Sequence, residues 1–270
     1  MSESEGPVGG SARVNTGVAH NARVWNHWIG GKDNYEVDQV VGDQVAAMFP
    51  VIRDVARADR DFLGRAVRYL AADCGVRQFL DIGTGLPTLD NTHEIAQRIA
   101  PESKIVYVDN DPLVLVHART LLTSTPEGST DYIDADVHRP DSIVEGVTAT
   151  LDLGRPVAVM MLGILNFVLD TGQAQDIVRR IMAAVPSGSY LALTHPTTDS
   201  DLGGEGNVAA MKFWNENATP PITARSRTEV TAFFDGLDPV APGIVSCSQW
   251  RAESGSPVVV PQFGAVARKP

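Results

Sequence analysis

Two acidic residues and two glycines are spaced in a way that suits the binding of a small organic ligand. Asp81 precedes the stretch Gly83-Thr84-Gly85, and Asp109 follows at the end of the next apolar run. Glycine has no Cβ, so the backbone at these positions can approach a ligand closely. A carboxylate can accept hydrogen bonds from both hydroxyls of a ribose. Together these residues predict a site for an adenosine-containing ligand.

The stretches around these residues have the pattern of a nucleotide-binding α/β unit. Residues 79–82 are expected to form a short buried strand, and a helix is expected to begin near Asn91 or Thr92. Residues 105–108 predict a second buried strand that ends at Asp109. Strand, glycine turn and helix in this order open a nucleotide-binding fold. A plain strand-to-helix turn is the structural alternative.

The identity of the adenosine ligand follows from the residues near the glycines. A dinucleotide fingerprint needs a third glycine, but Thr88 stands at that position. The carboxylate of Asp81 would repel a pyrophosphate and would suit a ligand that carries an amine. S-adenosylmethionine has a sulfonium, an amino group and no phosphate. The pattern therefore favours S-adenosylmethionine, and an NAD(P)-dependent oxidoreductase remains the alternative.

Further motifs are spread over most of the chain. They are residues 22–25 with 30–35, then 65–70, 78–88, 106–112 and 188–195. In combination they resemble the actinobacterial S-adenosyl methyltransferase family, formerly classed as a domain of unknown function. The resemblance implies a class I methyltransferase fold and leaves the acceptor open. Three residues depart from the family pattern: Asp59 stands in place of Asn, His138 in place of Arg, and Asn166 in place of His.

The resemblance also implies how the rest of the cofactor is bound. A third strand is expected at 130–133, and the acid after it, Asp136, would accept from the adenine amino group. The backbone N–H of Val137 would donate to an adenine ring nitrogen. An N-terminal cap for the following helix is the alternative role of Asp136. The full set of predicted cofactor-binding residues is Asp81, Gly83, Thr84, Gly85, Asp109, Asn110, Asp136, Val137 and Gly163.

Two residues are candidates for the catalytic step. Ligands of open α/β sheets bind beyond the carboxyl ends of the strands. A fourth strand is expected at 156–162, so the residues after it, Gly163, Leu165 and Asn166, should face the transferred methyl group. His195 ends a fifth strand at 188–194 and is the best candidate for a general base. A structural histidine that is hydrogen-bonded at a strand end is the alternative.

The segment 21–38 is dense in aromatic and amide side chains around Gly30-Gly31. We interpret it as a lid over the cofactor or substrate with the glycines as its hinge; a helix packed on the core is the alternative. The predicted substrate and lid residues are His27, Trp28, Lys32, Asn34, Tyr35 and Arg57. Arg57, or alternatively Arg60, would bind the carboxylate of the cofactor, unless these arginines form only a solvated basic face.

Composition limits the partners. The 270 residues carry a formal net charge of −11 and contain no run of Lys or Arg, which argues against nucleic acid as the substrate. The longest apolar run, 156–169, is shorter than the roughly 18–20 residues of a membrane span. No Cys/His spacing predicts a metal site. Two cysteines and no visible signal peptide indicate the cytoplasm.

These observations combine into one prediction. We expect an α/β protein with a Rossmann-like, seven-stranded, mostly parallel sheet, helices on both faces and an N-terminal helical lid. Residues 1–17 should be a disordered tail and 18–270 a single domain, with 18–74 as the lid or cap and 75–270 as the core. The predicted function is S-adenosylmethionine-dependent methylation of a small molecule. A non-catalytic S-adenosylmethionine-binding protein is the alternative, and the oligomeric state stays open.

Overall fold

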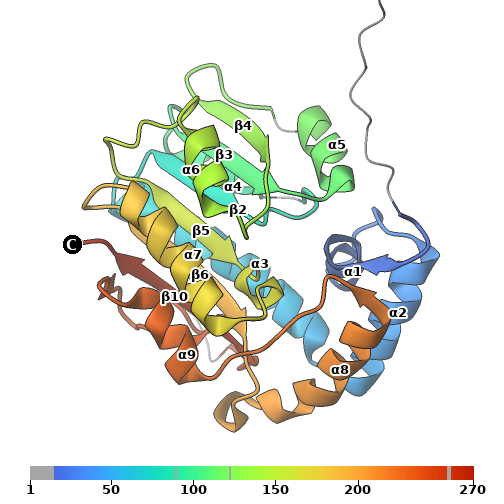
Figure 1. Cartoon of the computed structure of the whole chain (residues 1–270). Coiled ribbons are helices and arrows are strands. Elements are labelled where there is room, and N and C mark those ends of the chain that lie inside the picture. The colour runs from blue at the N-terminus through green and yellow to red at the C-terminus, as the bar shows by residue number, and fades with distance from the viewer. Residues whose placement is uncertain (1–14, 89, 122, 254–256) are drawn as a thin grey trace, which may run out of the picture.

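The computed structural model describes residues 15–88, 90–121, 123–253 and 257–270, and a mixed sheet lies between two layers of helices (Figure 1). The predicted disordered tail, 1–17, lies outside the described residues except for 15–17. The α/β class and the mostly parallel sheet agree with the prediction.

Parallel strands form the centre of the sheet. The strand order is β4-β3-β2-β5-β6-β10-β8, and β9 pairs with β10. Neighbours from β4 to β6 run parallel, while β10 runs antiparallel to β6, β8 and β9. In the described chain this makes eight strands and not the predicted seven, because β8 and β9 are separate two-residue strands. The strands are β2 (Gln78–Ile82), β3 (Lys104–Asp109), β4 (Ser129–Asp134), β5 (Ala158–Leu162), β6 (Tyr190–Pro196), β8 (Asp238–Pro239), β9 (Val245–Ser246) and β10 (Gln262–Arg268).

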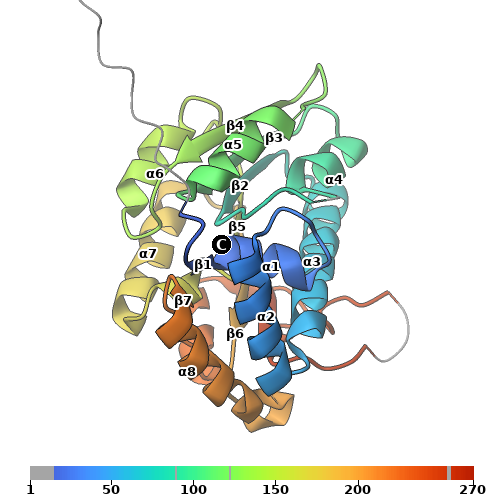
Figure 2. The same cartoon turned by 90° about the vertical axis from the view of Figure 1, so that its right-hand side faces the viewer.

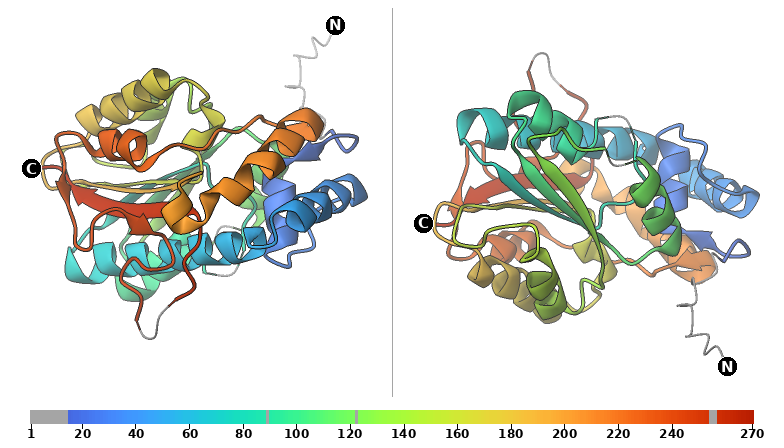
Figure 3. Two further views of the ribbon diagram at one scale, coloured as in Figure 1. Left: turned by 90° about the horizontal axis from the view of Figure 1, so that it is seen from below. Right: turned by 90° about the horizontal axis from the view of Figure 1, so that it is seen from above.

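Alternate side chains of the central strands enter two separate cores. In β2, Phe79 packs into the core beneath α3 and α4, whereas Leu80 and Ile82 pack into the core beneath α6, α7 and α9. This alternation is the period-two pattern of a strand that is buried on both faces. Figure 3 shows the resulting three layers. The helices around the sheet are α3 (Ile52–Arg68), α4 (Thr92–Ile99), α5 (Pro112–Leu121), α6 (Pro140–Val147), α7 (Thr171–Ala184) and α9 (Arg227–Thr231).

Several short helical turns connect these elements. A π-helical turn, Tyr69–Asp73, continues α3, and turns of 3-10 helix lie at Leu165–Phe167, Ser200–Leu202, Gly204–Gly206 and Ala232–Phe234. The first of these 3-10 turns follows β5 directly, so it places residues 165–167 at the carboxyl end of the parallel sheet.

Three further helices close one end of the molecule (Figure 2). They are α1 (Asn21–Trp28), α2 (Glu36–Met48) and α8 (Asn207–Asn217), and we call them the cover. A short parallel pair, β1 (Ala19–His20) with β7 (Ala218–Thr219), links the start of the described chain to the segment after α8. The cover therefore combines residues 19–48 with residues 207–219, which lie far apart in the sequence.

The cover differs from the predicted cap at 18–74. The helix α3 belongs to the layer on the sheet, because it packs against α4 and β10 and its apolar residues enter the core with Phe79. The helix α8, which lies far along the chain, packs on α2 instead. Among the described residues, no helix has the length and apolar character needed to cross a membrane.

Candidate active site

A cavity lies between the carboxyl ends of the parallel strands and the cover. From the exits of β2 and β3 it is lined by Asp81, Gly83, Thr84, Gly85, Asp109 and Asn110. Gly163 and Asn166 line it after β5, and Trp28 lines it from the cover. The structure therefore brings most of the predicted cofactor residues to one place.

The glycine turn is shaped by close packing on one side and open space on the other. Gly83 has φ +79°, and a Cβ there would lie 2.6 Å from Cδ1 of Ile164. Gly85 has φ +66°, and a Cβ there would meet nothing within 4 Å. Only glycine adopts such φ values without strain. The backbone at Gly85 is thus bare and accessible, as close approach to a ligand requires.

Asp109 organises this turn. Its Oδ2 accepts from the backbone N–H of Gly85 at 2.8 Å, and its Oδ1 accepts from the N–H groups of Asn110 and Asp111 at 2.8 and 3.0 Å. Burial raises the pKa of the Asp109 carboxyl, although these hydrogen bonds oppose the shift. A carboxylate has about four acceptor positions. Three are occupied, so the carboxylate has room for about one ribose hydroxyl rather than for the expected two.

Asp81 is a buried acid beside the turn. The hydroxyl of Thr92 donates to Asp81 Oδ2 at 2.6 Å. Burial raises the pKa of Asp81 to about 6, while the hydrogen bond from Thr92 and the charge of Arg60 oppose the shift. The carboxyl therefore changes its charge near neutral pH.

Arg60, and not Arg57, lies at the cavity. Arg60 lines it and donates from Nη2 to the backbone oxygen of Asp90 at 3.0 Å and to Asn91 Oδ1 at 3.2 Å. Arg57 lies one turn earlier on the same face of α3, where it is exposed and pairs with Asp54 at 3.1 Å. Arg57 is not among the residues that line the described cavity, so its contact with the ligand stays a prediction.

The two predicted adenine residues lie after the end of β4 and do not line the cavity. Asp136 and Val137 follow β4. Asp136 Oδ1 accepts from the backbone N–H of His138 at 2.9 Å and lies 2.8 Å from His138 Nδ1. Val137 is buried in the core beneath α6 and α7. Neither residue is among those that line the described cavity, and their role toward adenine stays a prediction.

Trp28 is the predicted cover residue that faces the cavity. Its indole Nε1 donates to the backbone oxygen of Gly42 at 3.0 Å, which fixes the ring between α1 and α2. Its ring centroid lies 5.9 Å from that of Trp25 and 6.4 Å from that of Trp214, and all three tryptophans line the cavity. The cover therefore supplies an aromatic wall.

The other predicted cover residues serve the cover itself. His27 Nε2 lies 3.0 Å from Asp43 Oδ1 and so joins α1 to α2. Asn34 donates to Asn26 Oδ1 at 2.8 Å and closes the turn between these helices. Tyr35 stands at the N-terminus of α2, and Lys32 is exposed. None of these four predicted residues lines the described cavity, which differs from the expectation that their side chains face the ligand.

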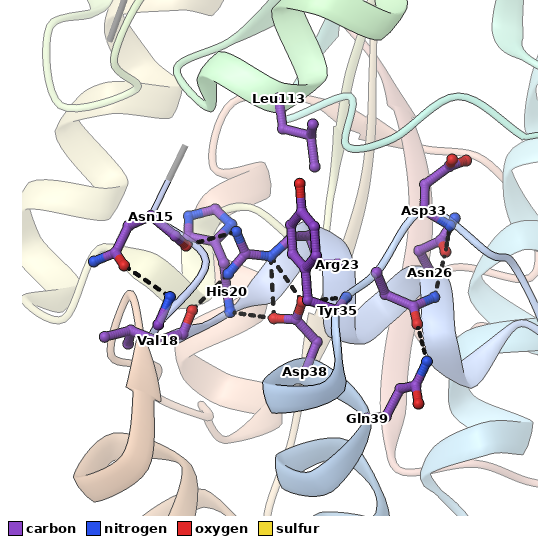
Figure 4. A network of polar contacts seen from close by, with 12 residues as sticks. Asn15, Val18, His20, Arg23, Asn26, Asp33, Tyr35, Asp38, Gln39 and Leu113 are labelled. Carbon is purple, nitrogen blue, oxygen red and sulfur yellow. Dashed lines mark hydrogen bonds and ion pairs between the residues drawn. The ribbon is translucent and has the colours of Figure 1, made fainter. Parts of the chain in front are cut away.

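A buried ion pair anchors the cover (Figure 4). Arg23 Nε donates to Asp38 Oδ1 at 3.0 Å and lies 2.9 Å from Oδ2, and the two side chains are 3% and 0% exposed. Asp38 also accepts from the backbone N–H groups of His20 and Tyr35. His20 in turn lies 2.9 Å from Asp111, beside the turn that Asp109 organises. An acid in the first turn of a helix, as Asp38 is in α2, was the available sequence signal for this network.

His195 is fully buried and both of its ring nitrogens are occupied. Nδ1 donates to the backbone oxygen of Pro196 at 2.8 Å, and Nε2 accepts from Arg225 Nη1 at 2.8 Å. A guanidinium can only donate and a carbonyl can only accept, so these partners define the neutral tautomer. Burial lowers the pKa of His195 to about 3. The predicted general base has no lone pair available, and its geometry is that of the structural alternative.

Asn166 lines the cavity with a buried amide group. The residue is 7% exposed, and Oδ1 has no hydrogen-bond partner among the described residues. Its backbone oxygen accepts from Thr223 N at 2.9 Å, which holds the turn after β5 in place. A buried amide oxygen without a partner is costly. The position is therefore prepared for a hydrogen-bond donor that is not part of the described chain.

Asp59 lines the same cavity and was not predicted as a site residue. It lies on α3 among residues that form the buried side of this helix, and it is 8% exposed. Gln262 Nε2, from β10, donates to Asp59 Oδ1 at 2.5 Å. The sequence did contain a signal, because an acid interrupts the apolar stripe formed by Ile52, Val55, Phe62 and Leu63.

The lining fits S-adenosylmethionine. The bare backbone at Gly85 leaves space for the ligand, and the remaining acceptor position of Asp109 suits a ribose hydroxyl. The buried acid Asp81 suits the amine, and Arg60 suits the carboxylate. In the described part of the chain, no group of three or more His, Cys, Asp or Glu side chains is placed to hold a metal ion.

Known proteins share the sequence and the fold of this chain. Residues 8–270 match the family described as S-adenosyl methyltransferase. A DUF574 family protein from Streptomyces avermitilis is 44% identical, with a TM-score of 0.90 over 96% of this chain and 100% of that one. A putative methyltransferase from Thermobifida fusca is 34% identical, with a TM-score of 0.86 over 94% of this chain and 96% of that one.

A more distant solved structure shares only the fold. It is a SAM-dependent methyltransferase from Anabaena variabilis, 12% identical, with a TM-score of 0.50 over 92% of this chain and 95% of that one. No curated protein matches the chain. The family match favours the methyltransferase over the NAD(P)-dependent oxidoreductase. The chain belongs to the S-adenosyl methyltransferase family, and it is an enzyme that uses S-adenosylmethionine as its methyl donor.

Proposed function

We propose that this methyltransferase acts on a small organic molecule enclosed between the cofactor residues and the cover. One observation carries the proposal: a single cavity joins the acid and glycine residues after β2 and β3 to an aromatic wall of Trp25, Trp28 and Trp214. Aromatic walls with few polar groups are typical of small-molecule sites. The formal net charge of −11 supports an acceptor other than nucleic acid.

Within this proposal, each cofactor group has a binding residue. Asp109 accepts from the ribose, the backbone of Gly83 to Gly85 carries the amino-acid part, and Asp81 faces its ammonium group. Arg60 binds its carboxylate. Asp136 and Val137 take the adenine, which extends the site past the described lining toward the exit of β4.

The cofactor supplies a methyl group on a sulfonium, so the acceptor atom bonds to the methyl carbon while the carbon–sulfur bond breaks and its electron pair stays on sulfur. The protein aligns the acceptor with Gly163 and Asn166 at the exit of β5 and excludes water with the cover. His195 does not move a proton in this proposal. It holds Arg225, which donates to the backbone oxygens of Leu165 and Val168 and thereby positions Asn166.

We also infer that the enzyme works in the cytoplasm. Cys74 and Cys247 are both free thiols, which suits a reducing compartment. The two solved proteins at 34% and 44% identity come from actinobacteria, which supports the same origin for this chain.

Transfer of an isotope-labelled methyl group tests the proposal. The purified full chain is incubated with labelled S-adenosylmethionine and a cell extract separated into low-mass, nucleic-acid and protein fractions. We expect label in the low-mass fraction, and less label with Asp109→Ala. Label in a macromolecular fraction contradicts a small-molecule acceptor. Binding of the cofactor without transfer to any fraction favours the alternative of a non-catalytic binding protein.

A further inference from the structure

Asp59 is a buried acid for which the cofactor has no evident use. Asp59 is 8% exposed and lines the cavity from α3. Among the described residues, Gln262 donates from its amide to Asp59 Oδ1, and the side chain of Thr194 also faces the carboxyl. In the described part of the chain, Asp59 has no ion-pair partner within 4.0 Å. The titratable groups that face it are Arg60, the next residue on α3, and the buried thiol of Cys247.

A buried carboxylate in this position destabilises the folded protein unless a cation lies beside it. Burial raises the pKa of the Asp59 carboxyl, because the charged form loses its hydration. The side chains of Thr194 and Gln262 and the charge of Arg60 oppose this shift, although Arg60 Nη2 itself is directed to Asp90 and Asn91. The cavity side of Asp59 is therefore the place where an additional positive group would gain most.

The wall around this position suits the body of an apolar cation. Trp28 and Trp214 come from the cover, Phe49 and Ile52 from the start of α3 and the turn before it, and Met211 from α8. The faces of tryptophan rings attract ammonium groups, and the remaining side chains offer only apolar contact. A ligand with an apolar body and one basic nitrogen can contact the aromatic wall with its body and bind to Asp59 through its nitrogen.

Asn166 supplies an independent observation. It lines the same cavity, its side chain is more than nine-tenths buried, and its Oδ1 has no hydrogen-bond partner in the described chain. An amide oxygen accepts and cannot donate. Both polar groups that the cofactor leaves unused, at Asp59 and at Asn166, thus require a ligand with N–H or O–H donors.

We propose that the methyl acceptor is an apolar amine whose ammonium group binds to the Asp59 carboxylate and donates a second hydrogen bond to Asn166 Oδ1. The ammonium nitrogen gives one proton to Asp59, which becomes a neutral carboxyl group, and the neutral nitrogen keeps its lone pair for the methyl group. The proton passes to water when the product leaves. This inference rests on the proposed function and names the acceptor class of the same site.

Ligand pairs that share a body and differ in the polar group test the proposal. Calorimetric titrations use the full chain saturated with S-adenosylhomocysteine, with phenethylamine against phenethyl alcohol and phenylacetate, and tryptamine against tryptophol. We expect each amine to bind about 10- to 100-fold more tightly than its alcohol, as a charge-assisted hydrogen bond implies. Phenylacetate should bind most weakly, because it places a second anion beside Asp59.

The variant Asp59→Asn keeps the shape and removes the charge. We expect it to lose the preference for the amine, with the affinity for the alcohol and for S-adenosylhomocysteine unchanged. Asp61→Asn is the matched control, because Asp61 is exposed on the same helix and does not line the cavity. Asn166→Leu should weaken amine binding several-fold and provides a second test if Asp59→Asn does not fold.

Three outcomes overturn the proposal. They are equal binding of amine and alcohol by the wild-type chain, no binding of either amine, and an unchanged preference in Asp59→Asn. In each case a normal affinity for S-adenosylhomocysteine leaves the proposed function standing with another acceptor class. Failure to bind S-adenosylhomocysteine at all contradicts the proposed function itself.

Discussion

The carboxylate of Asp109 accepts a hydrogen bond from the backbone N–H of Gly85 at 2.8 Å. The contact ties the tip of β3 to the glycine turn after β2, so the turn proposed to approach the cofactor is held by the residue proposed to bind the ribose. Loss of this carboxylate should therefore affect the shape of the site as well as one ligand contact.

Replacing Asp109 by Ala should weaken the binding of S-adenosylhomocysteine by about 2–3 kcal/mol, the size of a charge-assisted hydrogen bond together with the loss of loop order. Titration calorimetry measures the change. Asp134→Ala is the control, because Asp134 is the register partner of Asp109 on β4 and is exposed. Equal affinities of wild type and Asp109→Ala would remove Asp109 from the cofactor site.

The affinity for S-adenosylhomocysteine should rise as the pH increases from about 5 to about 7. Burial raises the pKa of Asp81 to about 6, so the carboxyl gains the negative charge that attracts the ligand's ammonium group over this range. The groups around it are Thr92, Arg60 and Asp109. Asp81→Asn should remove the rise near pH 6. Dissociation constants for S-adenosylhomocysteine, measured at several pH values, test this prediction. A wild-type affinity that does not change with pH contradicts the proposed contact between Asp81 and the ammonium group.

The raised pKa of Asp81 also affects the stability of the protein without ligand, which should decrease as the pH rises. The pKa of Asp81 is higher in the folded chain than its ordinary value of 3.8, so the folded chain binds more protons between the two values. The free energy of unfolding contributed by this group is present at low pH and decreases as the pH rises from about 4 to about 6. His195, whose pKa is lowered to about 3, acts oppositely and favours the folded state above its ordinary pKa of 6.5.

Replacing His195 by Ala should lower the free energy of unfolding by about 2–3 kcal/mol, because a buried guanidinium N–H of Arg225 loses its acceptor. Urea denaturation measures this loss. The pH profile of turnover should keep its shape, since His195 transfers no proton. His138→Ala is the control on an exposed histidine. If a stable His195→Ala variant lost one of the pH-dependent changes in turnover that the wild type shows, His195 would be the general base after all.

Breaking the buried pair in the cover should have a larger effect. Arg23→Ala leaves the fully buried carboxylate of Asp38 without its cation, at a cost of about 3–5 kcal/mol. We expect faster hydrogen exchange in α1 and α2 and weaker binding of S-adenosylhomocysteine. The matched control is Arg53→Ala, whose ion pair with Asp43 is exposed and contributes at most about 1 kcal/mol. Equal exchange rates in the two variants argue against a cover anchored by Arg23.

Local patterns in the sequence were sufficient to predict that the glycine turn and two acids meet at one cavity. The glycine turn and the acids Asp81 and Asp109 follow apolar runs whose length and composition already indicate buried strands. Because parallel strands end at one edge of a sheet, their terminal residues meet without further information. For this reason the predicted class of fold and the predicted cofactor agree with the structure and the family.

The acceptor side depended on contacts between distant residues. Asp59 meets Gln262 and His195 meets Arg225 only after the chain has folded, and neither pair has a spacing that a periodicity reveals. The cover likewise depends on the pairing of β1 with β7. One signal was available and was missed: Asp59 occupies the apolar stripe of α3, where an acid is costly unless it has a function.

The structure of the full chain in complex with S-adenosylhomocysteine and phenethylamine would test both proposed sites at once. We expect the ribose at Asp109, the amino-acid part between Gly83 and Arg60, and the amine nitrogen within hydrogen-bond distance of both Asp59 and Asn166. A complex in which S-adenosylhomocysteine binds away from the glycine turn would contradict the cofactor site. A complex in which the amine avoids Asp59 would contradict the acceptor site alone.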